Sequence, residues 1–451
     1  MLEIVIPLLL LFIIALVKNI PKIGGNIRVA LLVAAISSAI ISGLGPIETL
    51  LAFIDGIDRL SWVIMLSVFG AIYAEAQVKL GAMDTTINTL RSAFGNSPRG
   101  LIAAVYITLI IAGSFLGDAI AASAVIGFLV INSLYELKIK PEQIGMIILV
   151  GASVGSIMPP ITQGVFLSAS LIGIEPDPVV KIAYITVSIV AVVAILESFR
   201  FVRGKKMPDH LKTKKSAFQI IKERWVTLVP LAVLVAIVIA NTLFDYNIFT
   251  EWVIFSVILE PLMEIPIVQG LTNQVVSAII VAIIVSFIFY SVRKDTKGVF
   301  KGGLSKVSQT VQIQLCAGVM VGVFYASGLI EKVALMAEGL ASSAVKIGGA
   351  VSVVIVGMLT GSQTTAQTVN ITFLGPILEN LNVDPTMIAL GASHIAAAGQ
   401  NMPPVGLTAF VVCGLIGGIL SKEVDPIKVM IYALPNSLLF LIIGLLAWFF
   451  G

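Results

Sequence analysis

The chain has 451 residues, of which 58% are hydrophobic and only 12% are charged. A soluble protein of this size carries about twice that share of charged residues, so a water-soluble globular protein is excluded and an integral membrane protein is predicted. The net charge of +3 is small and no basic run is interleaved with aromatic residues, which argues against a nucleic-acid partner.

About 20 apolar residues are needed to cross a lipid bilayer, and ten stretches are expected to do so. The predicted fold class is therefore an all-α polytopic membrane protein. The first stretch has no small-residue cleavage site, so it is interpreted as a retained helix and not as a signal peptide. The ten stretches are 2–17, 27–44, 60–77, 142–170, 179–199, 226–244, 272–291, 311–328, 386–420 and 427–449.

Two further pairs of apolar runs are too short and too close together to be independent spans. The first pair is 100–113 with 119–136, and the second is 349–360 with 366–380. Each pair predicts a re-entrant helical hairpin. The expected hairpin tips are Gly113–Asp118 and Gly361–Thr365.

Met-Pro-Pro runs interrupt the fourth and ninth spans, at 158–160 and at 402–404. A proline lacks an N–H and clashes with the preceding turn, so each span is predicted to split into two half-helices. Gly155 and Gly399 precede the two runs by the same number of residues. Paired, interrupted apolar segments in two halves of a chain are typical of the binding site of a secondary transporter.

Lysines and arginines give the expected orientation. If the loop after the first span is cytoplasmic, the 28 lysines and arginines lie on the cytoplasmic side with four exceptions: Arg59, Lys181, Lys332 and Lys346. This is the bias of the positive-inside rule. It holds only if 100–136 enters and leaves from the cytoplasm and 349–380 from outside. The halves are therefore predicted to be inverted-topology repeats, with both termini outside.

The two repeats are expected to divide at a basic linker, 201–225, interpreted as a solvated cytoplasmic loop. The first repeat covers 1–200 and the second covers 226–451. Segments 84–95 and 331–346 are amphipathic and are expected to lie at the membrane interface. In each repeat, scaffold spans are expected to come before a hairpin and a broken helix. The scaffold spans lie in 1–78 of the first repeat and in 226–328 of the second, and the hairpin and broken helix lie in 100–172 and in 349–420.

Irregular backbone at membrane depth is tolerated only where it packs in protein or lines a cavity. Unwound carbonyls suit a cation such as Na⁺, and half-helix N-termini suit an anion. Candidate ion ligands are Ser114, Asp118, Ser153, Gly155, Pro159, Thr364, Thr365, Gly399, Asn401 and Pro403. Candidate substrate-binding residues are Ser156, Thr162, Gln163, Ser362, Gln363 and Thr408. The competing interpretation is that such small and hydroxyl residues let membrane helices pack closely.

Asp118 is the most informative single residue, because an ionisable group at membrane depth is a functional hypothesis by default. It either ligates Na⁺, carries a proton, or pairs with a helix N-terminus. Glu197 lies near the end of a span, where interfacial solvation explains it. His394 is interpreted as a packing residue.

The interrupted segments resemble a known family. The run Gly155–Ile161 and the run Met402–Leu407, followed by Ala409-Phe410-Val411, are similar to two signatures of the large membrane subunit of tripartite ATP-independent periplasmic (TRAP) transporters. The similarity is closest to the branch that uses TAXI-type binding proteins, and it covers about residues 60–450. Gly357-Met358, before the second tip, fits as well.

This resemblance implies an elevator-type secondary transporter in the cytoplasmic (inner) membrane. The hairpins and broken helices would form a mobile domain, and the other spans a scaffold. Family members couple import of small organic anions (carboxylates) to Na⁺ bound near the tips and breaks, without an organic cofactor. Their partners are an extracytoplasmic substrate-binding protein and a small membrane subunit. Here Gly117-Asp118-Ala119 stands where the family commonly has Gly-Ser-Ser, so H⁺ remains an alternative ion.

Three other functions compete with this interpretation. A stand-alone carboxylate symporter or ion exchanger would keep the fold and need no partner protein. An intramembrane aspartyl protease needs two carboxylates, yet no second aspartate falls within a predicted span, and the zinc-protease and serine-hydrolase motifs are absent from the sequence. The chain is therefore not expected to be an enzyme. A passive channel fits two symmetric hairpins less well than alternating access.

Overall fold

The computed structural model describes residues 2–17, 20–21, 23–94, 96–160, 162–212, 215–244, 246–329, 332 and 341–451. Within these ranges the regular structure is helical and contains no strand, so the all-α prediction is confirmed. Four helices are long and apolar enough to cross a membrane by themselves, and two bent helix pairs also qualify if each is one span.

One group of helices packs around α16 and is called the frame. Helix α16 contacts α2, α3 and α4, while α14 packs on α4 and α11. The helices of the frame are α1 (Leu2–Leu16), α2 (Ile27–Ser42), α3 (Pro46–Arg59), α4 (Ser61–Leu80), α11 (Ala217–Phe244), α14 (Gln274–Ile288) and α16 (Thr296–Ala326).

The second group, called the hairpin unit, packs around α8 and α20. It consists of α6 (Pro98–Leu116), α7 (Ala119–Glu136), α8 (Pro141–Ile157), α9 (Gln163–Ile172), α10 (Pro176–Ser198), α18 (Ser342–Thr360), α19 (Gln363–Asn380), α20 (Pro385–Gln400), α21 (Leu407–Leu420) and α22 (Pro426–Phe450). The hairpin unit meets the frame where α4 contacts α6 and α9, α16 contacts α19, and α1 contacts α18.

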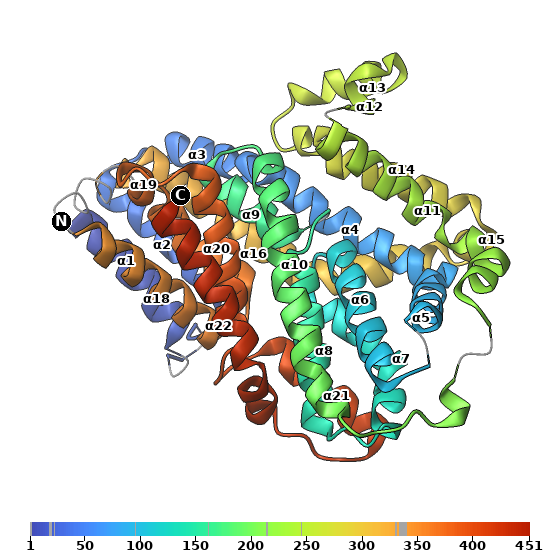
Figure 1. Ribbon diagram of the computed structural model, residues 1–451. Helices are drawn as coiled ribbons and strands as arrows, with labels where there is room; N and C mark the ends of the chain where they lie inside the picture. The colour runs from blue at the N-terminus through green and yellow to red at the C-terminus, as the bar shows by residue number, and fades with distance from the viewer. Residues whose placement is uncertain are drawn as a thin grey trace.

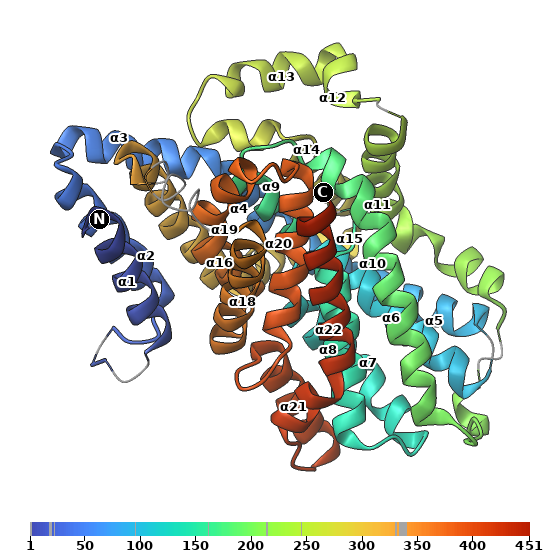
Figure 2. The same ribbon diagram turned by 60° about the vertical axis from the view of Figure 1, so that its left-hand side comes forward.

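The remaining helices lie at the margins of these groups. Helix α5 (Ala82–Ala93) packs on α11 and α6, and α15 (Tyr290–Arg293) packs on α4 and α14. Helix α12 (Ile248–Glu251) and α13 (Val253–Met263) project from the frame. In Figures 1 and 2, α3 and α13 lie at the same end of the molecule as the C-terminus.

Both predicted interruptions are present. Helix α8 ends at Ile157 and α9 begins at Gln163, while α20 ends at Gln400 and α21 begins at Leu407. The prolines between them have no N–H to donate, so the helical ladder cannot pass. The segments after the two breaks lie at opposite ends of the molecule, α9 toward the C-terminus and α21 away from it (Figures 1 and 2).

Glycine pairs bring each hairpin into backbone contact with a broken helix. A methyl group on Gly155 of α8 would lie 2.8 Å from the Cα of Gly113 on α6. A methyl group on Gly399 of α20 would lie 3.2 Å from the Cα of Gly357 on α18. The two contacts occupy equivalent places in the two halves, since both pairs are 42 residues apart (155 − 113 and 399 − 357).

The Gly155→Ala variant is therefore expected to lose stability. Its methyl group would also lie 2.8 Å from the carbonyl oxygens of Leu109 and Ile110, and overpacking of this kind costs about 1–3 kcal/mol. Thermal unfolding of the detergent-solubilised protein measures the loss. Gly414→Ala in α21 is the matched control, because a methyl group there meets no atom within 4 Å. Equal stability of the two variants would contradict the backbone contact.

Several boundaries differ from the sequence-based expectations. Helices α3 and α13 lie in segments for which no helix was expected. These segments are too short for a membrane span and contain acidic residues, so the search for apolar spans passed over them. Helix α11 begins at Ala217, inside the segment expected to be a linker, so the connection is shorter than 201–225. Segment 84–95 is largely α5, whereas most of 331–346 lies outside the described residues.

The family resemblance assigned every span outside the hairpins and broken helices to the scaffold, including 179–199 and 427–449. These two spans are α10 and α22, which pack on α8 and α20. They belong to the hairpin unit because their apolar faces are buried against the broken helices.

Candidate functional site

A cavity of about 410 Å³ lies between the hairpin unit and the frame. Both hairpin tips line it, together with the first residues after each break. The frame contributes Ala15, Gly25, Ile27 and Ile313. The hairpin unit contributes Gly117, Asp118, Ile120, Gln163, Leu359, Thr360, Gly361, Ser362, Gln363, Thr364, Thr365, Gln400, Val405, Leu407 and Thr408.

The first tip is built by Gly117 and Asp118. Gly117 has a φ of +63°, in the left-handed region that a residue with a Cβ rarely enters, and it ends α6. Asp118 then caps α7: its Oδ1 accepts from the Ile120 N–H at 3.1 Å and its Oδ2 from the Ala121 N–H at 3.3 Å. The predicted alternative of pairing with a helix N-terminus is thus present, and the same carboxylate lines the cavity.

The second tip repeats this geometry without a charge. Gly361 has a φ of +67° and ends α18. Ser362 caps α19 by accepting from the Thr365 N–H at 3.2 Å. Gln363 and Thr364 follow in the first turn, where backbone N–H groups have no partner within the helix. A hydroxyl cap leaves this N-terminus without the anion that neutralises α7.

Two hydrogen bonds between predicted residues join the two halves. Ser153 on α8 donates its hydroxyl to the Oδ1 of Asn401 at 2.7 Å. Gln363 donates its Nε2 to the hydroxyl of Ser156 at 3.0 Å. Seven of the predicted side chains line the cavity: Asp118, Gln163, Ser362, Gln363, Thr364, Thr365 and Thr408. Outside its lining lie Ser114, Ser153, Gly155, Ser156, Pro159, Thr162, Gly399, Asn401 and Pro403.

Two residues of the cavity lining carry a buried polar atom without a hydrogen-bond partner among the described residues: the Oε1 of Gln363 and the Nε2 of Gln400. Buried polar groups are nearly always satisfied, and here the Gln363 oxygen can accept a hydrogen bond and the Gln400 amide can donate one. Among the described residues no three His, Cys, Asp or Glu side chains cluster as metal ligands do. The oxygens present suit a hard cation.

Sequence reasoning missed the wall formed by the frame. Ala15, Gly25, Ile27 and Ile313 are small or apolar, and no local pattern distinguishes them from lipid-facing residues. Ser67 and Gln314 behind that wall had a usable signal. Each is a buried polar residue inside an apolar span, which is a reason to suspect function.

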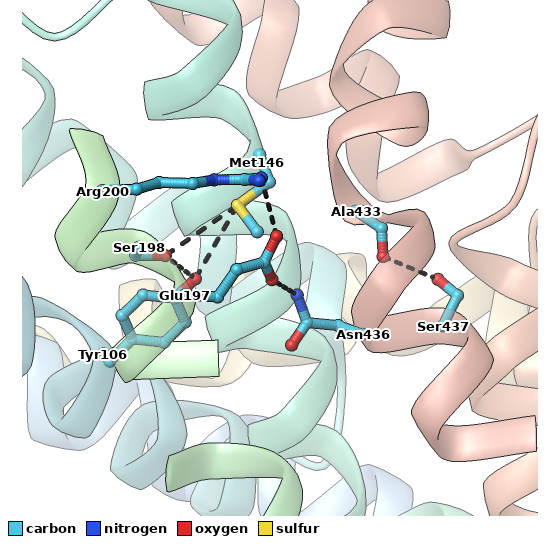
Figure 3. Close-up of polar contacts among 8 residues, drawn as sticks. All are labelled: Tyr106, Met146, Glu197, Ser198, Arg200, Ala433, Asn436 and Ser437. Atoms are coloured by element: carbon cyan, nitrogen blue, oxygen red, sulfur yellow. Dashed lines mark hydrogen bonds and ion pairs between the residues drawn. The ribbon is translucent and has the colours of Figure 1, made fainter. Parts of the chain in front are cut away.

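Glu197 forms part of a polar cluster at the junction of α10 and α22 (Figure 3). Its carboxylate forms an ion pair with Arg200 at 2.6 Å and accepts from the Nδ2 of Asn436 at 2.5 Å. Its side chain is only 15% exposed, so tertiary contacts, more than interfacial solvation, explain it. His394 is buried, with its Nδ1 2.9 Å from the Leu390 carbonyl, in keeping with a packing role.

Asn436→Leu is expected to destabilise the hairpin unit. The change keeps the side-chain volume but leaves the Oε2 of Glu197 without its donor, and a hydrogen bond to a charged group is worth about 1.5–3 kcal/mol. Thermal unfolding should show the loss. Ser437→Ala is the control, because the hydroxyl of this buried neighbour donates within its own helix to Ala433. A wild-type unfolding temperature for Asn436→Leu would show that the Glu197 contact is dispensable.

The sequence from residue 8 to residue 450 matches the family model described as "Tripartite ATP-independent periplasmic transporter, DctM component". The chain belongs to this family. It is therefore a multi-pass membrane transporter of the secondary type and not an enzyme. The family typically works with a small membrane subunit and a binding protein.

Two solved structures share the fold. The YdaH transporter of Alcanivorax borkumensis has 16% sequence identity and a TM-score of 0.59, with 89% of this chain and 86% of that chain covered. MtrF of Neisseria gonorrhoeae, described as illuminating a class of antimetabolite efflux pumps, has 15% identity and a TM-score of 0.59, with 98% and 94% covered. At these identities the likeness shows the fold alone. No curated protein sequence matches this DctM-family chain.

Proposed function

We propose that this chain couples the movement of a cation, Na⁺ in the first instance, to the import of a small organic anion. One observation carries the proposal: both hairpin tips and the residues that follow both breaks meet at a single cavity of about 410 Å³. Such a volume suits a small molecule. Cargo and ion would then bind close together, so that each can raise the affinity for the other.

Helix N-termini supply the attraction for an anion. The first turns of α9, α19 and α21 contribute Gln163, Gln363 and Leu407 to the cavity lining. An N-terminus carries about half a positive charge from the helix dipole. The described residues lining the cavity include no lysine or arginine. A carboxylate would therefore be held by N–H groups, amides and hydroxyls, which favours a small anion over a polyanion.

Asp118 supports the cation. It is the one carboxylate among the described lining residues, and hydroxyl and amide oxygens of Thr364, Thr365 and Gln363 lie on the facing tip. Carboxylate, hydroxyl and carbonyl oxygens are ligands that hard cations prefer. The same carboxylate could instead take up a proton, so H⁺ is the alternative coupling ion.

The division into hairpin unit and frame supports an elevator movement. Cross-contacts include apolar ring pairs, Trp62 with Phe166 and Tyr73 with Phe115, which can slide without unpairing hydrogen bonds. The opposite placement of α9 and α21 favours inverted repeats. The cavity lies against the α1–α2 connection, which the lysine and arginine bias assigns to the cytoplasm, so we assign this conformation as inward-facing.

Uptake into proteoliposomes tests the proposal. Radiolabelled mono- and dicarboxylates are offered with an inward Na⁺ gradient, an inward H⁺ gradient or neither, with and without the co-purified binding protein and small subunit. Accumulation driven by the Na⁺ gradient is the expected result. Uptake that is independent of both gradients would rule out ion coupling. Uptake of neutral solutes alone would rule out an anionic substrate.

The same assay separates a second candidate. MtrF, which shares the fold over 98% of this chain, is described among antimetabolite efflux pumps, so the second candidate is a symporter or exchanger that works without a binding protein. Such a protein would transport its substrate in proteoliposomes that contain this chain alone. A partner-dependent rate instead supports assembly with the subunits typical of the family.

A further inference from the structure

A buried chain of polar side chains crosses from the hairpin unit to the frame. Gln163, the first residue of α9, donates its Nε2 to the hydroxyl of Ser67 on α4. Ser67 in turn donates to the Oε1 of Gln314 on α16 at 3.0 Å. The three residues are 7%, 4% and 0% exposed. Three helices from both groups therefore converge on one hydrogen-bonded point.

This point touches the cavity directly. Gln163 lines the cavity, and Gln314 follows Ile313, which also lines it. The amide of Gln163 has two N–H groups, so one can bond Ser67 while the other remains for a ligand. The orientation of this cavity donor is therefore set by residues of the frame.

The contact also depends on how the hairpin unit is docked. The aromatic contacts beside it, Trp62 with Phe166 and Tyr73 with Phe115, tolerate sliding because apolar contact is not directional. Hydrogen bonds depend steeply on distance and angle. A displacement of α9 along α4 would break the Gln163–Ser67 bond and release the Gln163 amide.

We propose that Ser67 and Gln314 are positioning residues that hold Gln163 in the cavity only while the hairpin unit is docked as in this conformation. The frame thereby completes the site in one state and not in the other. Binding strength and docking position become linked, since a contact made in a single state shifts the equilibrium toward it. The inference rests on the proposed movement of the hairpin unit but not on the choice of ion or cargo.

Sidedness of cysteine labelling tests it without a known substrate. Cys316 and Cys413 are replaced by alanine, and Thr364→Cys reports from the cavity. A membrane-impermeant maleimide is applied to right-side-out and inside-out vesicles, and the ratio of the two labelling rates is measured. Ser67→Ala and Gln314→Leu should each lower labelling from the side of the α1–α2 connection relative to labelling from the opposite side. The expected change in the ratio is about 5-fold, roughly the effect of one net hydrogen bond.

Two controls separate positioning from general damage. Ser67→Thr keeps the hydroxyl and should restore the wild-type ratio. Ser38→Ala removes an equally buried serine, whose hydroxyl lies 2.9 Å from that of Ser327 within the frame, and should leave the ratio unchanged. An unchanged ratio in folded Ser67→Ala and Gln314→Leu overturns the proposal. So does an equal shift in Ser38→Ala, or equal labelling from both sides in every variant.

A cross-link adds an independent readout. In the double variant Gln163→Cys and Ser67→Cys, Hg²⁺ should bridge the two cysteines and hold the hairpin unit in the conformation described here. Thr364→Cys should then be labelled only from the side of the α1–α2 connection. Failure of the two cysteines to bridge would overturn the contact. The proteoliposome assay keeps the two proposals distinguishable. If the protein accumulates no anion but the Ser67 and Gln314 variants shift the labelling ratio, the proposed cargo is wrong and this inference stands. If uptake is normal but the ratio is unchanged, the proposed function stands and this inference is wrong.

Discussion

Asp118→Asn is expected to abolish the ion dependence of uptake while the fold is retained. The side chain caps α7 by accepting from the Ile120 N–H at Oδ1 and from the Ala121 N–H at Oδ2, and an asparagine carbonyl can keep one of these two bonds. The charge, by contrast, is lost. A unit charge about 4 Å from a bound cation is worth about 4 kcal/mol at an effective dielectric constant of about 20, which corresponds to roughly 1,000-fold in ion affinity.

Ion-dependent uptake in proteoliposomes measures this change, with the apparent ion affinity taken from the Na⁺ titration. Asp384→Asn is a matched control, because Asp384 also caps a helix, α20, by accepting from the N–H groups of Thr386 and Met387. It lies outside the cavity lining. Normal Na⁺ dependence of Asp118→Asn would assign Asp118 to capping alone. A variant that loses its response to pH instead would identify H⁺ as the ion.

Replacing Pro403 and Pro404 together with alanine is expected to reduce transport to background. Helix α20 stops at Gln400, and two alanines would restore the missing donors and favour continuation of the helix. Continuation would displace Val405, Leu407 and Thr408, which line the cavity after the break. It would also break the bond from the Val405 N–H to the Met358 carbonyl, 3.1 Å long, which ties the second break to its hairpin.

Uptake and thermal unfolding of this double variant are measured together. The helix should become no less stable, so a loss of transport at normal stability is the expected combination. Pro230→Ala is the control, since Pro230 lies inside α11 of the frame, in a helix that continues past it. Wild-type uptake by the double variant would show that the open backbone at the break has no role in transport.

The hairpin tips and helix breaks were predictable because their causes are local. A proline removes a donor at its own position, and a glycine permits a positive φ at its own position. Gly117, Gly361 and the two Met-Pro-Pro runs therefore end helices at the places that the sequence indicates. Seven of the predicted site residues line the cavity for the same reason, since they flank these interruptions.

The neighbours of each helix were not predictable. The apolar composition of α10 and α22 is the same whether they face lipid or protein, so hydropathy could not show that they belong to the hairpin unit. Helix α3 mixes apolar and acidic residues and lacks the length of a span. The frame wall and the Gln163–Ser67–Gln314 chain join residues more than 90 positions apart, a relation that no sequence period contains.

The two glycine pairs constrain how access to the cavity can be gated. Where Gly113 faces Gly155 and Gly357 faces Gly399, no side chain stands between the backbones, and so no rotamer change there can open a passage. We therefore expect each hairpin tip to move together with its broken helix, so that the rate of opening depends on the lipids around the hairpin unit more than on the chemistry of any single tip residue.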